Sequence, residues 1–266
     1  MKVIDLNLFD RDRSRKVPVL IYLPSVHNGI LPAVIFGPGY QSQKDLLCEK
    51  PAYKRYEYLA KYFTNRCFAF ISIQHDIPGD TDGLEIIDQY LPQHYARKHL
   101  YERGAENISF VLKNLVHLPI LLDKFIIAGH SNGGDIAKYF ANNNPELVSN
   151  IIVFDARRCK LETQSEVRLL MFEADDTETD LEVLPKPNQM DNSRRTNSEW
   201  VIIKPRRAVH RSYLDDYITD DLQKRVFRDL DYFLQLENQS RFLDNAHSQE
   251  YNATTPYHIR ENHDPP

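Results

Sequence analysis

The sequence has few cysteines, no long apolar run and no surplus of basic residues, and each absence excludes a class of protein. Its three cysteines lack a CxxC spacing, which fits reduced thiols rather than a disulfide framework or a zinc site. No apolar run approaches the length of a membrane-spanning helix, and the first residues lack the apolar centre of a signal peptide. The net charge of −5 argues against general nucleic-acid binding. We therefore expect a cytoplasmic protein with no nucleic-acid partner and no membrane span.

Short apolar runs alternate with helical patterns along most of the chain, and this alternation predicts an α/β fold. Two alternating segments, 3–8 and 17–23, flank a charged turn and predict an antiparallel hairpin. Continuous apolar runs, typical of strands buried on both faces of a parallel sheet, follow at 32–36, 67–73, 124–128, 151–154, 167–172 and 200–203. Helical patterns lie at 51–63, 97–115, 132–143 and 218–236. We predict one domain, 1–237, with an eight-stranded, mostly parallel sheet flanked by helices, and a mobile or loosely docked tail, 238–266.

Glycine is scarce, yet three of the nine glycines fall within the six positions of Gly129-His130-Ser131-Asn132-Gly133-Gly134. The pattern Gly-x-Ser-x-Gly between a buried strand and a helix is typical of a nucleophile elbow. A serine at the tip of such a turn has strained dihedrals, and the residues two before and two after it have no room for side chains. We therefore predict that Ser131 is a nucleophile.

A serine hydroxyl needs a base, and a histidine is the usual one. In this architecture an acid and then the histidine follow the serine along the chain. His210 lies directly after the last predicted strand, where that order places the base. Two acids fit the remaining role, because Asp155 follows the strand at 151–154 and Asp176 follows the strand at 167–172.

Acyl transfer also requires donors that stabilise the developing oxyanion. The backbone N–H of Asn132, directly after the serine, is the first candidate. The second is the N–H of Tyr40, which follows Gly37-Pro38-Gly39 after the strand at 32–36. The two glycines there permit a close approach of the backbone.

Four segments together resemble one known family. Residues 10–24 carry the pattern D-x-x-R-x-R-x-V-P-V-x-x-Y-x-P, 39–40 occupy the position of its His-Gly-x loop, 73–76 are similar to its strand-four exit, and 129–134 match its elbow. The chain thus resembles the α/β-hydrolase serine esterases, in particular the platelet-activating-factor acetylhydrolase and dienelactone-hydrolase-like branch. The resemblance implies the α/β-hydrolase fold. In the acetylhydrolases the acid follows strand six, which maps onto Asp155; in the dienelactone hydrolases and many esterases it follows strand seven, which maps onto Asp176. We take Asp155 as the acid, with Asp176 as the alternative.

The chain departs from the family at two places. Pro38 replaces the histidine that usually precedes the oxyanion glycine. Strands six and seven are joined only by residues 155–166, which leaves no room for a large lid. If the site has a cover, it must come from 41–60, 77–98 or the tail. Residues 80–95 are the insertion that we expect to face the substrate. We interpret the pair His75-Asp76 as a structural or pocket-edge feature, because adjacent residues at a strand end point to opposite sides.

These residues predict a serine hydrolase that cleaves a small-molecule carboxylic ester through a Ser131–His210–Asp155 triad and an acyl-enzyme, without metal or cofactor. A thioesterase or peptidase uses the same triad, so both are alternatives. A catalytically silent scaffold that serves as a binding module is a third.

Overall fold

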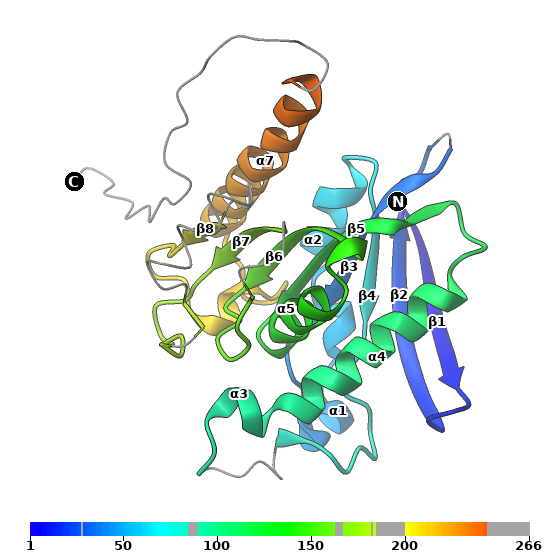
Figure 1. Cartoon of the computed structure of the whole chain (residues 1–266), viewed down its shortest axis with the longest axis vertical. Helices are drawn as coiled ribbons and strands as arrows, with labels where there is room; N and C mark the ends of the chain where they lie inside the picture. Colours follow the sequence, from blue (N-terminus) through cyan, green and yellow to red (C-terminus); the bar gives the residue numbers. More distant parts are fainter. Residues whose placement is uncertain (28, 85–89, 163–166, 182, 185–199, 244–266) are drawn as a thin grey trace.

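The computed structural model describes the whole chain except residues 28, 85–89, 163–166, 182, 185–199 and 244–266. It contains one central sheet with helices on both faces (Figure 1). Among the described residues, no helix is long and apolar enough to cross a membrane.

The sheet has eight strands in the order β1-β2-β4-β3-β5-β6-β7-β8. β2 pairs antiparallel with both β1 and β4, and every other pair is parallel. The predicted eight-stranded, mostly parallel sheet with an antiparallel hairpin at the start of the chain is therefore confirmed. The strands are β1 Lys2–Asp10, β2 Arg15–Leu23, β3 Leu31–Gly37, β4 Ala69–Ile73, β5 Ile120–His130, β6 Val148–Phe154, β7 Arg168–Phe172 and β8 Trp200–Ile203.

Two apolar cores lie on opposite faces of the sheet, because successive side chains of a strand point to opposite sides. On β5, Ile127 packs into the core under α4 and α5, whereas Ile126 packs into the core under α2 and α7. The parallel strands are buried along most of their length, as their continuous apolar runs predict. The helices and short 3₁₀ turns are α1 Gln43–Cys48, η1 Ala52–Lys54, α2 Glu57–Thr64, α3 Gln93–Ala96, α4 Lys98–Asn114, α5 Asn132–Asn143, η3 Pro145–Leu147, η4 His210–Tyr213 and α7 Asp220–Leu243.

The helix predicted at 51–63 is wrong as a single element, because η1 and α2 replace it. The break has a distant cause: the carboxylate of Asp215 accepts the backbone N–H groups of Glu57 and Tyr58, at 2.8 and 3.1 Å, and so caps α2. The Asp215 backbone N–H in turn donates to the Arg55 carbonyl at 3.0 Å. The chain turns at Arg55 and Tyr56 to make these contacts.

The predictions for the other helices agree with the structure to within a few residues, except at the end of the last one. α5 covers residues 132–143 as predicted, and α4 covers 98–114 of the predicted 97–115. α7 continues to Leu243, past the predicted end at residue 236 and into the segment expected to be a tail. The rest of that segment, 244–266, lies outside the described residues.

Candidate functional site

Ser131 occupies a one-residue turn between β5, which ends at His130, and α5, which begins at Asn132. Its φ of 51° and ψ of −124° lie in a region that side-chain-bearing residues rarely adopt. Hydrogen bonds hold the residue there: its N–H donates to the Phe154 carbonyl at 2.8 Å, and its carbonyl accepts the N–H of Gly134 at 3.0 Å. The backbone at Ser131 is therefore strained, and its hydrogen bonds to β6 and α5 hold it in this conformation.

The two glycines of the motif permit backbone to pack directly on backbone. A Cβ on Gly129 would lie 2.4 Å from the Gly133 carbonyl carbon, and a Cβ on Gly133 would lie 2.1 Å from the Gly37 carbonyl oxygen. Both positions thus exclude any side chain. The close approach of Gly133 to Gly37 also brings the end of β3 against the start of α5.

His210 and Asp155 are in hydrogen-bond contact, although 55 residues separate them. His210 begins η4, after β8, and its Nδ1 bonds to the Asp155 Oδ2. Asp155 follows β6 with a φ of 47° and is almost fully buried. Its Oδ1 also accepts the Ala174 N–H at 3.1 Å, and the Thr177 hydroxyl donates to the carboxylate at 2.9 Å. Four protein groups therefore fix this carboxylate, if the Arg157 Nε at 3.5 Å is counted.

The charge state of Asp155 follows from these contacts. Burial raises the pKa of its carboxyl, but the hydrogen bonds and charge of His210, the Thr177 hydroxyl and the Arg157 charge outweigh burial, so the net pKa lies below the ordinary value. Asp155 is thus an anion beside the His210 ring at neutral pH.

The side chain of Asp176, the alternative acid, contacts the backbone of His210 and not its ring. Its Oδ1 accepts the His210 main-chain N–H at 2.7 Å, whereas the His210 ring bonds to Asp155. The neighbouring Asp175 N–H donates to the Ala208 carbonyl at 2.6 Å. The loop after β7 therefore holds the backbone of the loop after β8.

Ser131 and His210 are not directly bonded: within the described part of the chain, no hydrogen bond joins the serine hydroxyl to the imidazole. His130, the residue before Ser131, contacts His210. Its ring centroid is 4.7 Å from that of His210. Both Ser131 and His210 are partly exposed.

The loop after β3 approaches the serine through Gly39, where a Cβ would lie 3.4 Å from the Ser131 Cβ. The N–H groups on both sides of Tyr40 are bonded: Gly39 donates to the Tyr56 hydroxyl and Gln41 donates to the Asp76 carboxylate, each at 3.3 Å. Asn132 is buried at the start of α5. The loop is therefore anchored on either side of the residue that the sequence predicts as an oxyanion donor.

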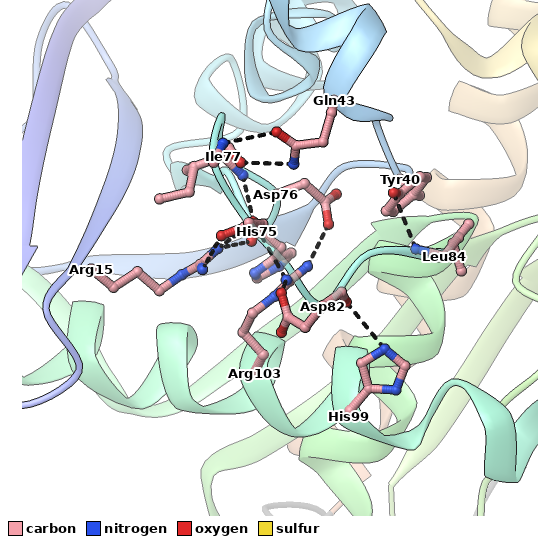
Figure 2. Close-up of polar contacts among 12 residues, drawn as sticks. Arg15, Tyr40, Gln43, His75, Asp76, Ile77, Asp82, Leu84, His99 and Arg103 are labelled. Atoms are coloured by element: carbon pink, nitrogen blue, oxygen red, sulfur yellow. Dashed lines mark hydrogen bonds and ion pairs between the residues drawn. The ribbon is translucent and has the colours of Figure 1, made fainter. Parts of the chain in front are cut away.

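A group that we call the arginine–aspartate cluster (Arg15, Arg103, Asp76, Asp80 and Asp82) supports this loop and was not predicted. Figure 2 shows Arg15, Arg103, Asp76 and Asp82. Arg103 of α4 pairs with Asp76 at 2.6 Å and also contacts Asp82. Arg15 of β2 donates to Asp80 at 2.5 and 3.0 Å. The only signal in the sequence is that Arg103 falls on the apolar side of its helix, between the buried Leu100 and Asn107.

Two residues outside the cluster also contact the start of the insertion at 80–95. The Tyr40 hydroxyl accepts the Leu84 N–H at 3.1 Å, and His99 contacts the Asp82 carbonyl at 3.1 Å (Figure 2). Residues 80–84 are thus tied both to α4 and to the loop after β3. Residues 85–89 of the insertion lie outside the described part of the chain.

His75 and Asp76 are both buried, with 1% and 2% of their surfaces exposed. Burial, together with the charges of Arg103 and Arg15, lowers the pKa of His75 to about 3, so its ring is neutral. Burial raises the pKa of Asp76 to about 7, against the opposing charge of Arg103. The Asp76 carboxylate faces Arg103 and the Gln41 N–H. The His75 Nε2 instead lies 2.9 Å from the position of a Cβ on Gly37.

Among the described residues, no group of three or more histidine, cysteine, aspartate or glutamate side chains is arranged to hold a metal ion. The acidic side chains of the arginine–aspartate cluster face guanidinium groups instead.

Comparison with protein-family models gave no match. A comparison with curated proteins gave none either. Solved structures, in contrast, are similar over most of the chain. A dienelactone hydrolase-like promiscuous phosphotriesterase from metagenomic libraries is 15% identical, with a TM-score of 0.61 over 88% of this chain and 98% of that one. One of two fungal esterases from Rhizomucor miehei is 11% identical, with a TM-score of 0.59 over 88% and 82% of the two chains.

A dienelactone hydrolase from Anabaena variabilis is 15% identical, with a TM-score of 0.52 over 88% of this chain and 98% of that one. The structural neighbours are thus dienelactone hydrolase-like proteins and esterases, as the resemblance in the sequence predicts. At these identities the likeness concerns the fold, and it agrees with the strand order and the turn at Ser131: the chain has the α/β-hydrolase fold.

Proposed function

We propose that the chain is a serine hydrolase that cleaves a carboxylic ester, with Ser131 as nucleophile, His210 as base and Asp155 as the acid that orients the base. The observation that carries the proposal is the contact between the His210 Nδ1 and the buried Asp155 carboxylate, beside a serine in a strained strand-to-helix turn. Structural neighbours described as esterases and dienelactone hydrolases favour an ester as the substrate.

In the proposed reaction the Ser131 Oγ forms a bond to the ester carbonyl carbon, and its proton passes to the His210 Nε2. The tetrahedral intermediate then collapses: the bond to the leaving oxygen breaks, and the imidazolium returns the proton to the departing alcohol. Water deprotonated by His210 hydrolyses the acyl-enzyme and restores the serine. The lack of a direct hydrogen bond between the two side chains is compatible with this cycle, because catalytic hydrogen bonds are often long or poorly aligned before substrate binds.

Asp155 keeps its negative charge throughout, which its lowered pKa supports. A carboxylate bonded to Nδ1 fixes the tautomer that leaves Nε2 able to accept the serine proton. The backbone N–H groups of Asn132 and Tyr40 are the proposed donors to the oxyanion. The anchored N–H groups of Gly39 and Gln41 support this role, because they fix the peptide planes around Tyr40.

Labelling with a fluorophosphonate tests the nucleophile. We expect a single adduct on Ser131 in the wild-type protein and none in Ser131→Ala. Turnover of acyl esters of graded chain length should likewise depend on Ser131. A folded wild-type protein that forms no adduct would remove the nucleophile and favour a silent scaffold. A parallel panel of thioesters and amides separates the thioesterase and peptidase alternatives, which share the triad.

A matched pair of isosteric variants tests the choice of acid. Asp155→Asn should lower kcat by about 10⁴, because an amide at this position favours the wrong imidazole tautomer. Asp176→Asn should lower kcat by less than about 10-fold, because its amide oxygen still accepts the His210 main-chain N–H. The opposite ranking of the two variants in ester turnover would contradict the assignment.

A further inference from the structure

His130, inside the serine motif, bonds to both loops that flank the proposed site. Its Nε2 lies 2.9 Å from the His210 carbonyl oxygen, and its Nδ1 lies 2.9 Å from the Tyr56 hydroxyl. Tyr56 in turn accepts the Gly39 N–H at 3.3 Å. The ring is 3% exposed, and its carbon framework packs against the rings of His210, Tyr56 and Tyr213.

In a neutral His130 ring, the chemistry of these partners permits one arrangement of protons. A carbonyl oxygen can only accept, so the His130 Nε2 carries the hydrogen and donates it to His210. In a neutral ring the Nδ1 then accepts, so the Tyr56 hydroxyl donates to it. The hydroxyl oxygen remains available to accept the Gly39 N–H. Gly39 thus donates to Tyr56, Tyr56 donates to the His130 Nδ1, and the His130 Nε2 donates to the His210 carbonyl.

We propose that His130 is a neutral positioning residue, locked in the Nε2–H tautomer, which ties the loop that carries His210 to the loop that carries Tyr40. The proposal rests on the proposed function for its catalytic consequence, but not for the tautomer itself. In a protonated ring the Nδ1–H would donate to the Tyr56 hydroxyl, which reverses the direction of this bond. The Nδ1–H tautomer would lose the bond to His210 and so break the link between the two loops.

The surroundings of the ring favour the neutral form. Burial and the neighbouring His210 lower the pKa of His130 to about 3, against the opposing charge of Asp155. The titratable and charged groups that face it are Tyr56 from the turn before α2, His210 and Tyr213 from η4, and Asp155 and Arg157 from the loop after β6. Burial also raises the pKa of Tyr56, so its hydroxyl stays a donor.

Nuclear magnetic resonance of the wild-type protein with ¹⁵N-labelled histidine tests the tautomer without any activity. We expect the His130 ring to show a protonated Nε2 and an unprotonated Nδ1, with no titration between about pH 5 and pH 9. His130→Gln identifies its signals by their loss. A ring that titrates in this range, or that carries its hydrogen on Nδ1, would overturn the proposal.

Two variants that cut the same link test its catalytic effect. Tyr56→Phe removes the donor to Nδ1, while His130→Gln keeps a donor at the ε position and loses the Nδ1 acceptor. We expect each to lower kcat/KM for the best ester by about 10- to 100-fold, since small displacements of catalytic groups have effects of this size. The double variant should lose little more than the more damaging single one, because both interrupt the same chain of bonds between the two loops.

The control is Tyr62→Phe, which removes a buried tyrosine hydroxyl that bonds to Asp231 at 2.8 Å, away from the site. It should keep the wild-type kcat/KM. Multiplicative losses in the double variant, or an effect of Tyr56→Phe no larger than that of Tyr62→Phe, would contradict the link. If Ser131 instead fails to label while the His130 signals behave as expected, the proposed function fails and the tautomer assignment stands.

Discussion

Replacing Arg103 by methionine removes the guanidinium that neutralises the most deeply buried carboxylate beside the loop after β3. The Asp76 side chain is only 3% exposed, and Arg103 is its ion-pair partner at 2.6 Å. Asp80 keeps its bonds to Arg15 in the variant. Loss of one partner from a buried pair destabilises a protein by about 3–5 kcal/mol, and we expect Arg103→Met to lower the free energy of unfolding by this amount at about pH 8.

The cost should depend on pH in a defined direction. The pKa of Asp76 in the folded protein is raised to about 7 from an ordinary 3.8, so the folded state binds this proton more tightly than the unfolded state. The contribution of this proton to the free energy of unfolding is fully present below about pH 4 and is lost as the pH rises through about 7. Removal of Arg103 raises the pKa of Asp76 further, so the variant should lose less stability at about pH 5, where Asp76 can take up a proton, than at about pH 8.

Urea denaturation at the two pH values measures both free energies of unfolding. The matched control is Lys98→Met on the same helix, which breaks an exposed pair with Glu102 at 3.2 Å and should change the free energy of unfolding by less than about 1 kcal/mol. Adding Asp76→Asn to Arg103→Met should recover part of the loss. A cost below about 1 kcal/mol at about pH 8, or an equal cost at both pH values, would refute the role of Arg103 as the counter-ion.

Three further substitutions probe the turn and the strand ends around it. Ser131→Gly relieves a backbone conformation that costs of order 1–3 kcal/mol, and should unfold at higher urea concentration than Ser131→Ala, which keeps the Cβ. An equal midpoint for the two would mean that the turn stores no strain. Gly133→Ala places a Cβ 2.1 Å from the Gly37 carbonyl oxygen, and thermal denaturation should show a loss of about 3 kcal/mol. Lys138→Met removes a side chain that is 2% exposed, together with its ion pair to Asp135 at 3.3 Å and its bond to the Ala156 carbonyl at 3.0 Å. It should destabilise the protein by about 3 kcal/mol and lower ester turnover, because Ala156 follows Asp155. Unchanged turnover in a folded variant would separate Lys138 from the site.

The fold could be predicted from local patterns because its signals are local. Continuous apolar runs identify strands that are covered on both faces, and the alternating segments at 3–8 and 17–23 identify the hairpin. The helix at 132–143 was predicted to the residue, because the serine motif fixes its start. The order of the strands in the sheet depends on the connections between these elements and not on local patterns. Only the resemblance to a known fold implies this order.

The features that escaped prediction depend on residues far apart in the chain. The cap that divides η1 from α2 comes from Asp215, more than 150 positions later. The arginine–aspartate cluster joins β2, α4 and the segment after β4, so no window of sequence contains it. The two candidate acids could not be separated by pattern either, because β6 and β7 are neighbours and both of their loops reach His210, one at its ring and one at its backbone.

His130 shows why the type of a residue does not reveal its role. Its position before the motif serine and its place in the chain order exclude it as the base. Only the contacts with Tyr56 and the His210 carbonyl indicate what the ring does. Such a role leaves no spacing pattern, because it depends on two partners that other loops bring into place.

The strand order has a consequence for the sequence of events during synthesis of the chain. β5 pairs with β3 and β6, so the turn at Ser131 can form once these three strands have been made. The ring that contacts Asp155 arrives only after β8, a four-residue strand at the far edge of the sheet. A nascent chain that has folded through β7 therefore carries the serine turn without the imidazole. Any reactivity that depends on His210 is acquired last, when the edge strand docks.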